Sequence, residues 1–252
     1  MQGLTPRGRY DRIGRSYGAT RREDPRIAAQ LHRALGDART VVNVGAGTGA
    51  YEPRDREVVA VEPSATMRAA RPAGAAPCVD AVAEALPFED RAFDAAMAVL
   101  TVHHWDDPAA GLRELRRVAR RAVVLGFDQH FGGPSWLTDD YLPGVLGKER
   151  PALPEAVAAL GGADAVRVEP VPVPRDCADG FLHAFWARPE AYLDPVVRAN
   201  ISVFALLDDE AERRFVATLR DDLRSGAWDA RHGPLRDRPE LDLGYRLLVA
   251  PG

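Results

Sequence analysis

The chain is poor in cysteine. Of its 252 residues only Cys78 and Cys177 are cysteines, too few for a disulfide framework and without the spacing of a metal site. We therefore expect two free thiols, no metal site and a cytoplasmic location. The first residues, MQGLTPRGRYDRIGRSYG, are polar and basic, so they do not resemble a secretory signal with its apolar centre.

Long apolar runs and an excess of positive charge are also missing. No stretch of about 18 consecutive apolar residues occurs, so no membrane span is expected. The formal net charge is −4, which argues against a nucleic-acid partner, because phosphate backbones are bound through an excess of clustered Lys and Arg. Hydrophobic residues make up 46% of the chain and charged residues 28%, a composition that indicates an ordinary globular protein. We expect a monomer or homodimer that acts on a small molecule.

Short apolar runs instead follow one another along the chain. They are VVNV (41–44), VVAVE (58–62), CVDAVAE (78–84), FDAAMAVL (93–100), RAVVLGF (121–127), VRVEPVPV (166–173) and GYRLLVA (244–250). Runs that are apolar on both faces are typical of a parallel sheet covered on both sides. Helix signals lie between them, such as Asp-Pro pairs at 24–25 and 107–108. The pattern predicts an α/β fold, Rossmann-like and doubly wound, with about seven mostly parallel strands.

One region breaks this alternation. Between the last two runs, Asp208 and Asp209 precede an amphipathic segment that ends near Gly226. We interpret residues 177–240 as a helical cap within a single domain. The parts expected are an N-terminal entry segment and helix (1–36), a cofactor-binding sheet (37–176), the cap (177–240) and the last strand (241–252).

The first strand run leads into three closely spaced glycines, in VVNVGAGTGAYE (41–52). Glycines after a strand permit a tight turn and the close approach of a ligand, and this spacing also fits a dinucleotide fingerprint. In an open parallel sheet the ligand lies beyond the carboxyl ends of the strands. These ends carry Gly45, Gly47 and Gly49, then Glu62, then Asp80, then residues 100–104.

The segment after the glycines distinguishes between cofactors. Only AYEPRDRE separates Gly49 from Val58, and Pro53 prevents a regular helix there. A pyrophosphate needs a helix N-terminus behind the glycine turn, which counts against a nicotinamide oxidoreductase. S-adenosylmethionine has no phosphate, so the short segment between Gly49 and Val58, without a helix, removes no contact that this cofactor needs. Glu62, 17 residues after Gly45, can accept hydrogen bonds from both ribose hydroxyls.

Four motifs in order carry a family resemblance: VVNVGAGTG, VVAVEPSATM, CVDAVAEALPFEDRAFDAAMA and VLTVHHW. Together they resemble the class I S-adenosylmethionine-dependent methyltransferases, and most of all the type 11 (ubiquinone/menaquinone-methyltransferase-like) small-molecule branch, over roughly residues 10–128. The resemblance implies a cofactor site with Gly45, Ala46 and Gly47 under the methionine part and Asn43 at its amino group. Glu62 is then at the ribose with Pro63 beside it, Met67 or its neighbours lie against the adenine, and Asp80 and Ala81 lie at the adenine edge. Leu100 is a main-chain contact, and the entry segment that folds over the cofactor contains Tyr10 and Tyr17 with Arg21 or Arg22.

The chain departs from this family in two respects. The family usually has an acid where Asn43 stands, and an amide cannot offer the cofactor's ammonium the same charge-assisted bond. If residue 43 faces the ammonium, Asn43→Asp is expected to bind the cofactor equally well or more tightly. The shortened first crossover is the other departure.

Histidines provide the candidates for catalysis. Methyl transfer requires an unprotonated nucleophile held in a dry pocket, and an imidazole can deprotonate a hydroxyl. His103 and His104 follow strand four and His130 follows strand five. The first two are the predicted catalytic residues, of which one could instead shape the cofactor pocket. The resemblance places His103 beside the cofactor, whereas His104 could point to the substrate or into the core. Asp179 is either a substrate contact or a helix cap.

The acceptor itself is not specified by the sequence. Aromatic residues in the cap favour a small aromatic or apolar metabolite, such as a secondary metabolite. The acceptor atom is open, and we favour O-methylation slightly over N- or C-methylation. VLTVHHW lacks the Asn/Asp-Pro-Pro-aromatic motif of nucleobase amino methylation. The alternative function is a protein that binds S-adenosylmethionine without transferring its methyl group, either a regulator or a non-methylating enzyme.

Overall fold

The structure is a computed structural model that describes residues 21–133, 135–145 and 152–252. Tyr10 and Tyr17, expected to contact the cofactor, lie outside the described residues. The strands are β1 (Thr40–Val44), β2 (Glu57–Val61), β3 (Cys78–Val79), β4 (Phe93–Val99), β5 (Ala119–Phe127), β6 (Arg167–Pro170), β7 (Val173–Pro174), β8 (Glu240–Leu241) and β9 (Tyr245–Ala250). The α-helices are α3 (Pro25–Ala34), α4 (Ala65–Ala69), α5 (Pro108–Val118), α6 (Leu153–Ala159), α7 (Pro195–Ala199), α8 (Asp209–Ser225) and α9 (Ala227–His232).

Seven strands form one sheet in the order β3-β2-β1-β4-β5-β9-β6. Strands β1 to β5 pair in parallel, and β9 runs antiparallel to both β5 and β6. This confirms the predicted Rossmann-like, doubly wound and mostly parallel sheet. The chain moves outward from β1 to β3 and then returns to β4 beside β1, so the switch in strand order places a crevice at the carboxyl ends of β1 and β4.

Both faces of the sheet are covered, as the apolar runs predicted. Val41 and Val123 contribute to one buried cluster with helix α3, whereas the next residues, Val42 and Val124, contribute to the opposite cluster with α5 and α6. Successive side chains of a strand point to opposite faces, so a run that is apolar throughout supplies both clusters. Asp24 and Asp107 cap α3 and α5 through their side chains, and a proline follows each.

Two predicted strands are shorter in the structure. The run 78–84 pairs only over Cys78–Val79, at the edge of the sheet, where β2 is the one partner of β3. The run 166–173 divides into β6 and β7, and β7 pairs with β8 in a separate two-stranded sheet. No helix intervenes between β1 and β2, in agreement with the effect expected of Pro53.

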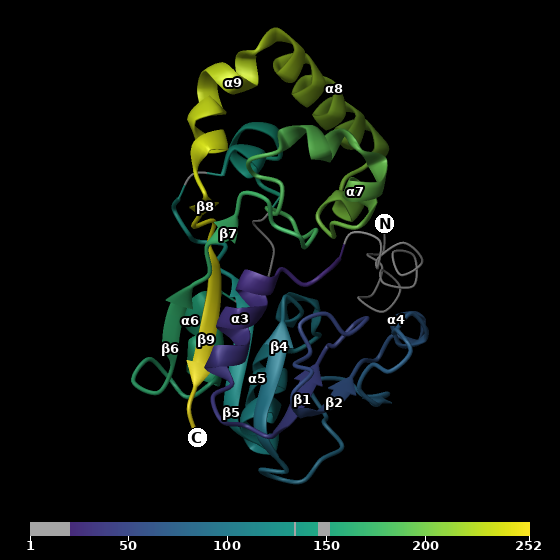
Figure 1. The fold of residues 1–252 in the computed structure, drawn as a ribbon, viewed down its shortest axis with the longest axis vertical. Coiled ribbons are helices and arrows are strands. Elements are labelled where there is room, and N and C mark those ends of the chain that lie inside the picture. Colours follow the sequence, from purple (N-terminus) through teal and green to yellow (C-terminus); the bar gives the residue numbers. More distant parts are fainter. Residues whose placement is uncertain (1–20, 134, 146–151) are drawn as a thin grey trace.

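The helices after β7 form an upper lobe over the carboxyl edge of the sheet (Figure 1). Helix α8 begins after the cap residue Asp208 and ends at Gly226, whose φ of 78° is left-handed. The lobe also contains η2, a π-helical turn (Leu137–Tyr141) that follows β5, and the 3-10 turns η3 (Pro189–Leu193), η4 (Phe204–Leu206) and η5 (Gly233–Asp237). Trp136 from the η2 segment shares one buried cluster with Phe215 of α8 and Trp228 of α9.

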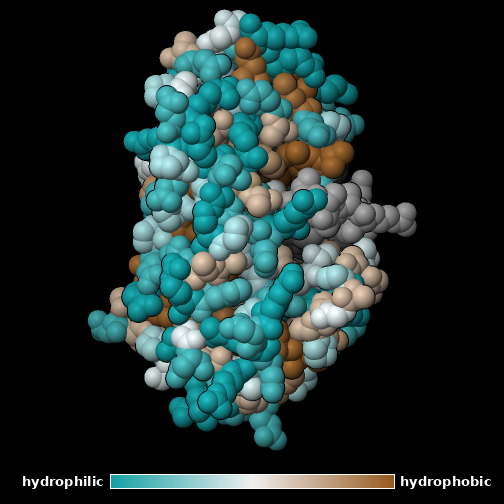
Figure 2. Space-filling view, viewed as in Figure 1, coloured by the Kyte–Doolittle hydropathy of each residue, from teal (hydrophilic) through white to brown (hydrophobic). Residues whose placement is uncertain are grey.

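The surface agrees with the composition. The face in Figure 2 is mostly hydrophilic, and few large apolar side chains are well exposed among the described residues: Val82, Val168, Val196 and Leu206. No helix in the described ranges is both long enough and apolar enough to cross a bilayer.

Candidate active site

A cavity of about 330 Å³ lies at the carboxyl ends of β1, β2 and β4. Ten of the predicted site residues line it: Arg21, Asn43, Gly45, Ala46, Gly47, Glu62, Pro63, Met67, Leu100 and His104. Residues far apart in the sequence therefore meet at one crevice, because parallel strands end at the same edge of the sheet. We name it the cofactor cavity.

The glycine turn is shaped for a ligand without phosphate. The N–H groups of Gly45 and Ala46 both donate to the Val61 carbonyl, at 2.9 and 3.0 Å, and the Gly47 N–H donates to Glu62. A pyrophosphate site needs such N–H groups unpaired and directed at the ligand. At Gly45, where φ is 69°, a Cβ would lie 2.2 Å from Thr101 Oγ1, so only glycine allows the turn to pack against the end of β4.

Glu62 is a buried carboxylate on the wall of this cavity. Its two oxygens accept hydrogen bonds from the N–H of Gly47 at 2.9 Å and from the N–H of Ser64 at 2.8 Å. Burial raises the pKa of Glu62, although these two bonds oppose the rise. Each oxygen retains lone-pair capacity for a further donor, and the predicted ribose contact would provide such donors.

The predicted adenine edge is arranged differently from the sequence expectation. Asp80 does not line the cavity; its side chain is 55% exposed and forms an ion pair with Arg68 at 2.7 Å. Ala81 packs against the core on the α5 side of the sheet. The cavity wall there consists of residues 82–84. Since β3 ends at Val79, these residues lie in a loop whose path the apolar pattern could not indicate.

Two residues of the cavity wall have strained backbones. Leu100 has a φ of 51° and Tyr51 a φ of 67°, the left-handed region that residues other than glycine seldom adopt. The Leu100 N–H donates to the Leu125 carbonyl, which fixes the end of β4 against β5. Such strain is maintained by the surrounding packing and is concentrated at functional sites.

The paired histidines occupy a 3-10 turn, η1 (Val102–His104), directly after β4. Their rings lie 3.7 Å apart between centroids. His104 lines the cofactor cavity, whereas His103 lines a separate cavity of about 40 Å³ beside α6. His130 is exposed and lines neither cavity. His104, rather than His103 as expected from the family motif, therefore lies at the cofactor cavity.

Arg21, rather than Arg22, lies at the cofactor cavity; Arg22 is exposed. The Arg21 Nε donates to Asp179 Oδ1 at 2.7 Å, and the hydroxyl of Tyr51 donates to Asp179 Oδ2 at 3.0 Å. Asp179 is 1% exposed and begins no helix, so these contacts replace the helix cap considered from the sequence. Tyr51 also lines the cavity, which joins the site to the lower end of the upper lobe.

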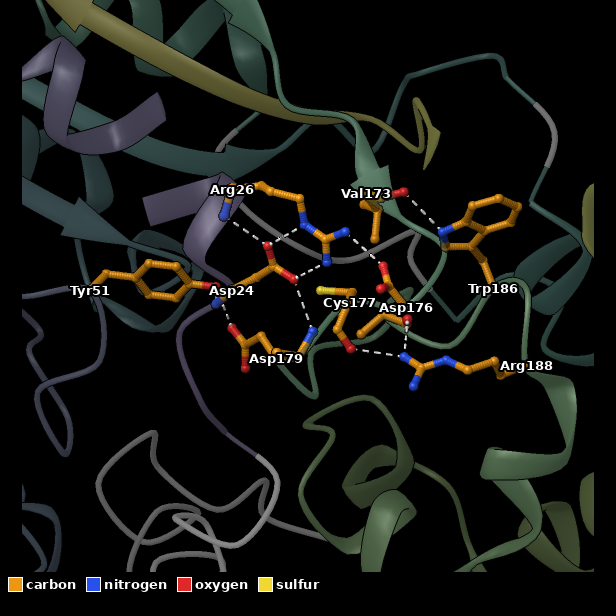
Figure 3. A network of polar contacts seen from close by, with 11 residues as sticks. Asp24, Arg26, Tyr51, Val173, Asp176, Cys177, Asp179, Trp186 and Arg188 are labelled. Carbon is orange, nitrogen blue, oxygen red and sulfur yellow. Dashed lines mark hydrogen bonds and ion pairs between the residues drawn. The ribbon is translucent and has the colours of Figure 1, made fainter. Parts of the chain in front are cut away.

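A second set of contacts continues this network, as Figure 3 shows. Asp24 accepts bonds from Arg26 and from the Ala178 N–H, and Arg26 also reaches Asp176. Burial alone would raise the pKa of Asp24, but these hydrogen bonds outweigh it and lower the pKa to about 2. Helix α3, the loop after β1 and the segment after β7 are thus connected by ion pairs and hydrogen bonds.

The sequence reasoning did not single out His183, which lies in a second cavity of about 200 Å³ at the end of β5. Its Nε2 lies 3.1 Å from Ser135 Oγ and its Nδ1 lies 3.1 Å from the Tyr245 hydroxyl. Burial lowers the pKa of His183 to about 3, so the ring is neutral at physiological pH. No spacing in the sequence relates these residues, because the upper lobe and the sheet bring them together.

Three features define a nucleoside-binding α/β protein of the methyltransferase class. They are the strand order, the glycine turn whose N–H groups are already paired and which no helix follows, and the buried acid after β2. The Methyltransferase domain family model matches residues 42–126. A putative methyltransferase from an antibiotic biosynthesis pathway of Anabaena variabilis is 30% identical, with a TM-score of 0.85 over 92% of this chain and 99% of that one. The chain belongs to the class I, type 11 family of S-adenosylmethionine-dependent methyltransferases.

Other comparisons cover less of the chain or are less identical in sequence. Uncharacterized methyltransferases of Mycobacterium bovis and Mycobacterium tuberculosis are 39% identical over 97 residues, which are 35% of this chain. The match spans 39% of the length of these curated relatives. The [4+2]-cyclase SpnF is 15% identical, with a TM-score of 0.58 over 100% of this chain and 98% of that one, a similarity of fold alone.

Proposed function

We propose that this protein transfers the methyl group of S-adenosylmethionine to a small, neutral aromatic or apolar metabolite, with a hydroxyl oxygen as the preferred acceptor. The observation that carries the proposal is the second cavity. It opens at the end of β5, the strand next to β4, whose end borders the cofactor cavity. Neighbouring parallel strands lie about 5 Å apart, so an acceptor in the second cavity can extend toward the first.

The lining of the second cavity supports this acceptor class. Its walls combine apolar and polar side chains, namely Phe127, Phe131, Leu142 and Leu243 with Gln129, Ser135, Thr138, Asp139 and His183. Within the described part of the chain, no Lys or Arg lines it. An anionic acceptor would need a cationic partner when buried, so this lining counts against an anionic acceptor and fits a ligand with apolar surface and hydrogen-bonding groups.

S-adenosylmethionine, when bound, supplies an electrophilic methyl group. The residues proposed to hold it are Glu62 at the ribose, Met67 at the adenine, and the glycine turn with Asn43 and Arg21 at the methionine part. His104 accepts the proton of the acceptor hydroxyl as the oxygen becomes a nucleophile. The aromatic walls exclude water and position the acceptor, which is the main catalytic requirement of a direct displacement.

Label transfer tests this function. The purified protein is incubated with S-adenosylmethionine that carries an isotopic label in its methyl group, together with a panel of neutral phenols, aliphatic alcohols and phenyl phosphates, and calorimetry measures cofactor affinity. We expect the label in a neutral phenol or related ring alcohol. Binding without transfer to any acceptor, including extracts of secondary metabolites, would favour the non-methylating alternative. A protein that does not bind the cofactor would exclude both.

The remaining assignments belong to the same proposal. A small metabolite as acceptor fits a cytoplasmic enzyme of secondary metabolism that acts as a monomer or homodimer and has no nucleic-acid partner. The single-domain arrangement, with residues 177–240 as a cap over the site, is likewise proposed. Its support is the buried network that joins the segment after β7 to the cofactor cavity.

A further inference from the structure

Asn43 departs from the family's acid, and its amide has an unusual environment. The residue lies near the end of β1, is 2% exposed and lines the cofactor cavity. Its Nδ2 donates to Glu52 Oε1 at 3.1 Å. Its Oδ1 is buried and has no hydrogen-bond partner among the described residues. A buried, unpaired acceptor costs free energy unless a ligand satisfies it.

The carboxylate of Glu52 determines which way this amide points. An ionised carboxylate only accepts hydrogen bonds, so the amide must direct its N–H group toward Glu52. The reverse orientation would place two acceptor oxygens against each other. Oδ1 is therefore held on the side away from Glu52.

Glu52 is itself held firmly. Arg71 Nη2 lies 2.8 and 2.9 Å from its two oxygens, and the side chains of Glu52 and Arg71 are 10% and 5% exposed. Arg71 also donates to the carbonyl of Gly47 at 3.2 Å. At Gly49 a Cβ would lie 3.1 Å from Glu52 Oε2 and 3.2 Å from Arg71 Nη1. The third glycine of the turn thus leaves room for this ion pair.

The two departures from the family meet at this point. Glu52 lies in the loop that replaces the first crossover helix, nine residues after Asn43. At the end of β1 this chain has the amide of Asn43 where the family usually has a carboxylate. The shortened loop places the carboxylate of Glu52 beside that amide. Glu52 therefore supplies the negative charge, and Asn43 is the residue that lines the cofactor cavity.

We propose that Glu52 is a positioning residue for recognition of the cofactor's ammonium group, which rests on the proposed function. Glu52 orients the Asn43 amide so that Oδ1 accepts a hydrogen bond from the ammonium, and its negative charge behind the amide supports that bond. Asn43→Asp alone then places two carboxylates against each other, and the one arginine there, Arg71, is already paired with Glu52. It weakens binding, contrary to the expectation from the sequence.

A double-mutant cycle tests the proposal with two probes. S-adenosylhomocysteine carries the amino acid group, and 5′-methylthioadenosine is the same thioether nucleoside without it. For S-adenosylhomocysteine we expect Glu52→Gln and Asn43→Asp each to weaken binding roughly tenfold, and the double variant, which exchanges acid and amide, to return within about threefold of wild type. Binding of 5′-methylthioadenosine should change less than about twofold in all three variants.

Asp55→Asn is the matched control, since Asp55 is in the same loop and its side chain is 79% exposed; it should leave both affinities unchanged. Thermal melting verifies that each variant is folded. Additive losses in the double variant, or equal losses for both probes, would show a structural role and overturn the proposal. If wild type binds 5′-methylthioadenosine but not S-adenosylhomocysteine, ammonium recognition is wrong, whereas binding of neither probe refutes the proposed function itself.

Discussion

Glu62 is one buried side chain with two roles, since it stabilises the local backbone and is proposed to bind the cofactor. Its oxygens hold the glycine turn and the start of α4 through backbone N–H groups. Glu62 also lines the cofactor cavity, where ribose hydroxyls are proposed to bind. We predict that Glu62→Gln weakens S-adenosylhomocysteine binding by about 1–3 kcal/mol, the range for lost hydrogen bonds to a charged acceptor. Calorimetry measures this, and unchanged affinity would contradict the ribose assignment.

The pH dependence of that affinity provides a second measurement. Burial raises the pKa of Glu62 above its ordinary value of 4.5 in the ligand-free protein. The ionised form accepts two donors and the protonated form is a poorer acceptor. Affinity should therefore be full well above the raised pKa and should fall as the pH decreases through it, at higher pH than for an ordinary carboxyl. Glu62→Gln should show a flatter profile, and identical profiles would exclude Glu62 as the titrating group.

The two adjacent histidines should differ in function. His104 lines the cofactor cavity and His103 lines the smaller cavity beside α6. With the acceptor identified by label transfer, we predict that His104→Gln lowers kcat by roughly 10²- to 10⁴-fold, the usual contribution of a general base. Cofactor affinity should remain close to wild type, and His103→Gln should cost less activity. Full activity of both variants would mean that positioning alone accounts for the reaction.

At the scale of elements, charged contacts connect segments that the sheet does not. Arg21, Tyr51 and Asp179 come from three separate parts of the chain, and the first two line the cofactor cavity. The interaction between Arg21 and Asp179 is largely buried, since their side chains are 13% and 0% exposed. Removing the carboxylate would leave a guanidinium and a hydroxyl without this partner.

We predict that Asp179→Ala lowers the free energy of unfolding by about 1–3 kcal/mol, because buried hydrogen-bonding groups lose a charged acceptor. Asp176→Ala is the matched comparison, since Asp176 also pairs with an arginine but its side chain is 70% exposed. Exposed pairs contribute little, so its urea unfolding curve should nearly coincide with wild type. Equal destabilisation by both substitutions would show that burial does not determine the effect.

At the scale of the whole molecule, the upper lobe has a core drawn from two distant parts of the chain. Trp136, Leu137, Tyr141 and Leu142 belong to the same buried cluster as residues of α8 and α9. Trp136 donates from Nε1 to the Trp186 carbonyl at 2.8 Å and contacts Trp228 edge-on. The lobe therefore depends on a segment that precedes α6.

We predict that residues 177–240 expressed alone do not fold. The fragment lacks the η2 segment and the sheet residues against which it packs, so its apolar side chains would remain in water. Circular dichroism with thermal melting should show no cooperative transition. A fragment that melts cooperatively would establish this part as an independent domain and contradict the single-domain arrangement.

Much of this molecule follows from local patterns. The apolar runs located seven strands of the sheet, and Asp-Pro pairs located the starts of α3 and α5, because period, capping and proline geometry act within a few residues. The absence of a helix after Gly49 followed from Pro53 in the same way. The four motifs, in their order, also carried the resemblance to the family and its cofactor. The place of the site followed from the sheet, since strand ends converge at one edge in any fold of this kind.

Other features depended on long-range packing. The sequence could not place Arg21 rather than Arg22 or His104 rather than His103 at the cavity, or bring His183 to Ser135 and Tyr245. Nor could it show that Glu52 faces Asn43, because that contact depends on how a non-helical loop folds back over the glycine turn. Local residue preferences therefore determined the elements and their order. The tertiary structure alone determined which side chains meet, since those contacts form only when distant segments are packed together.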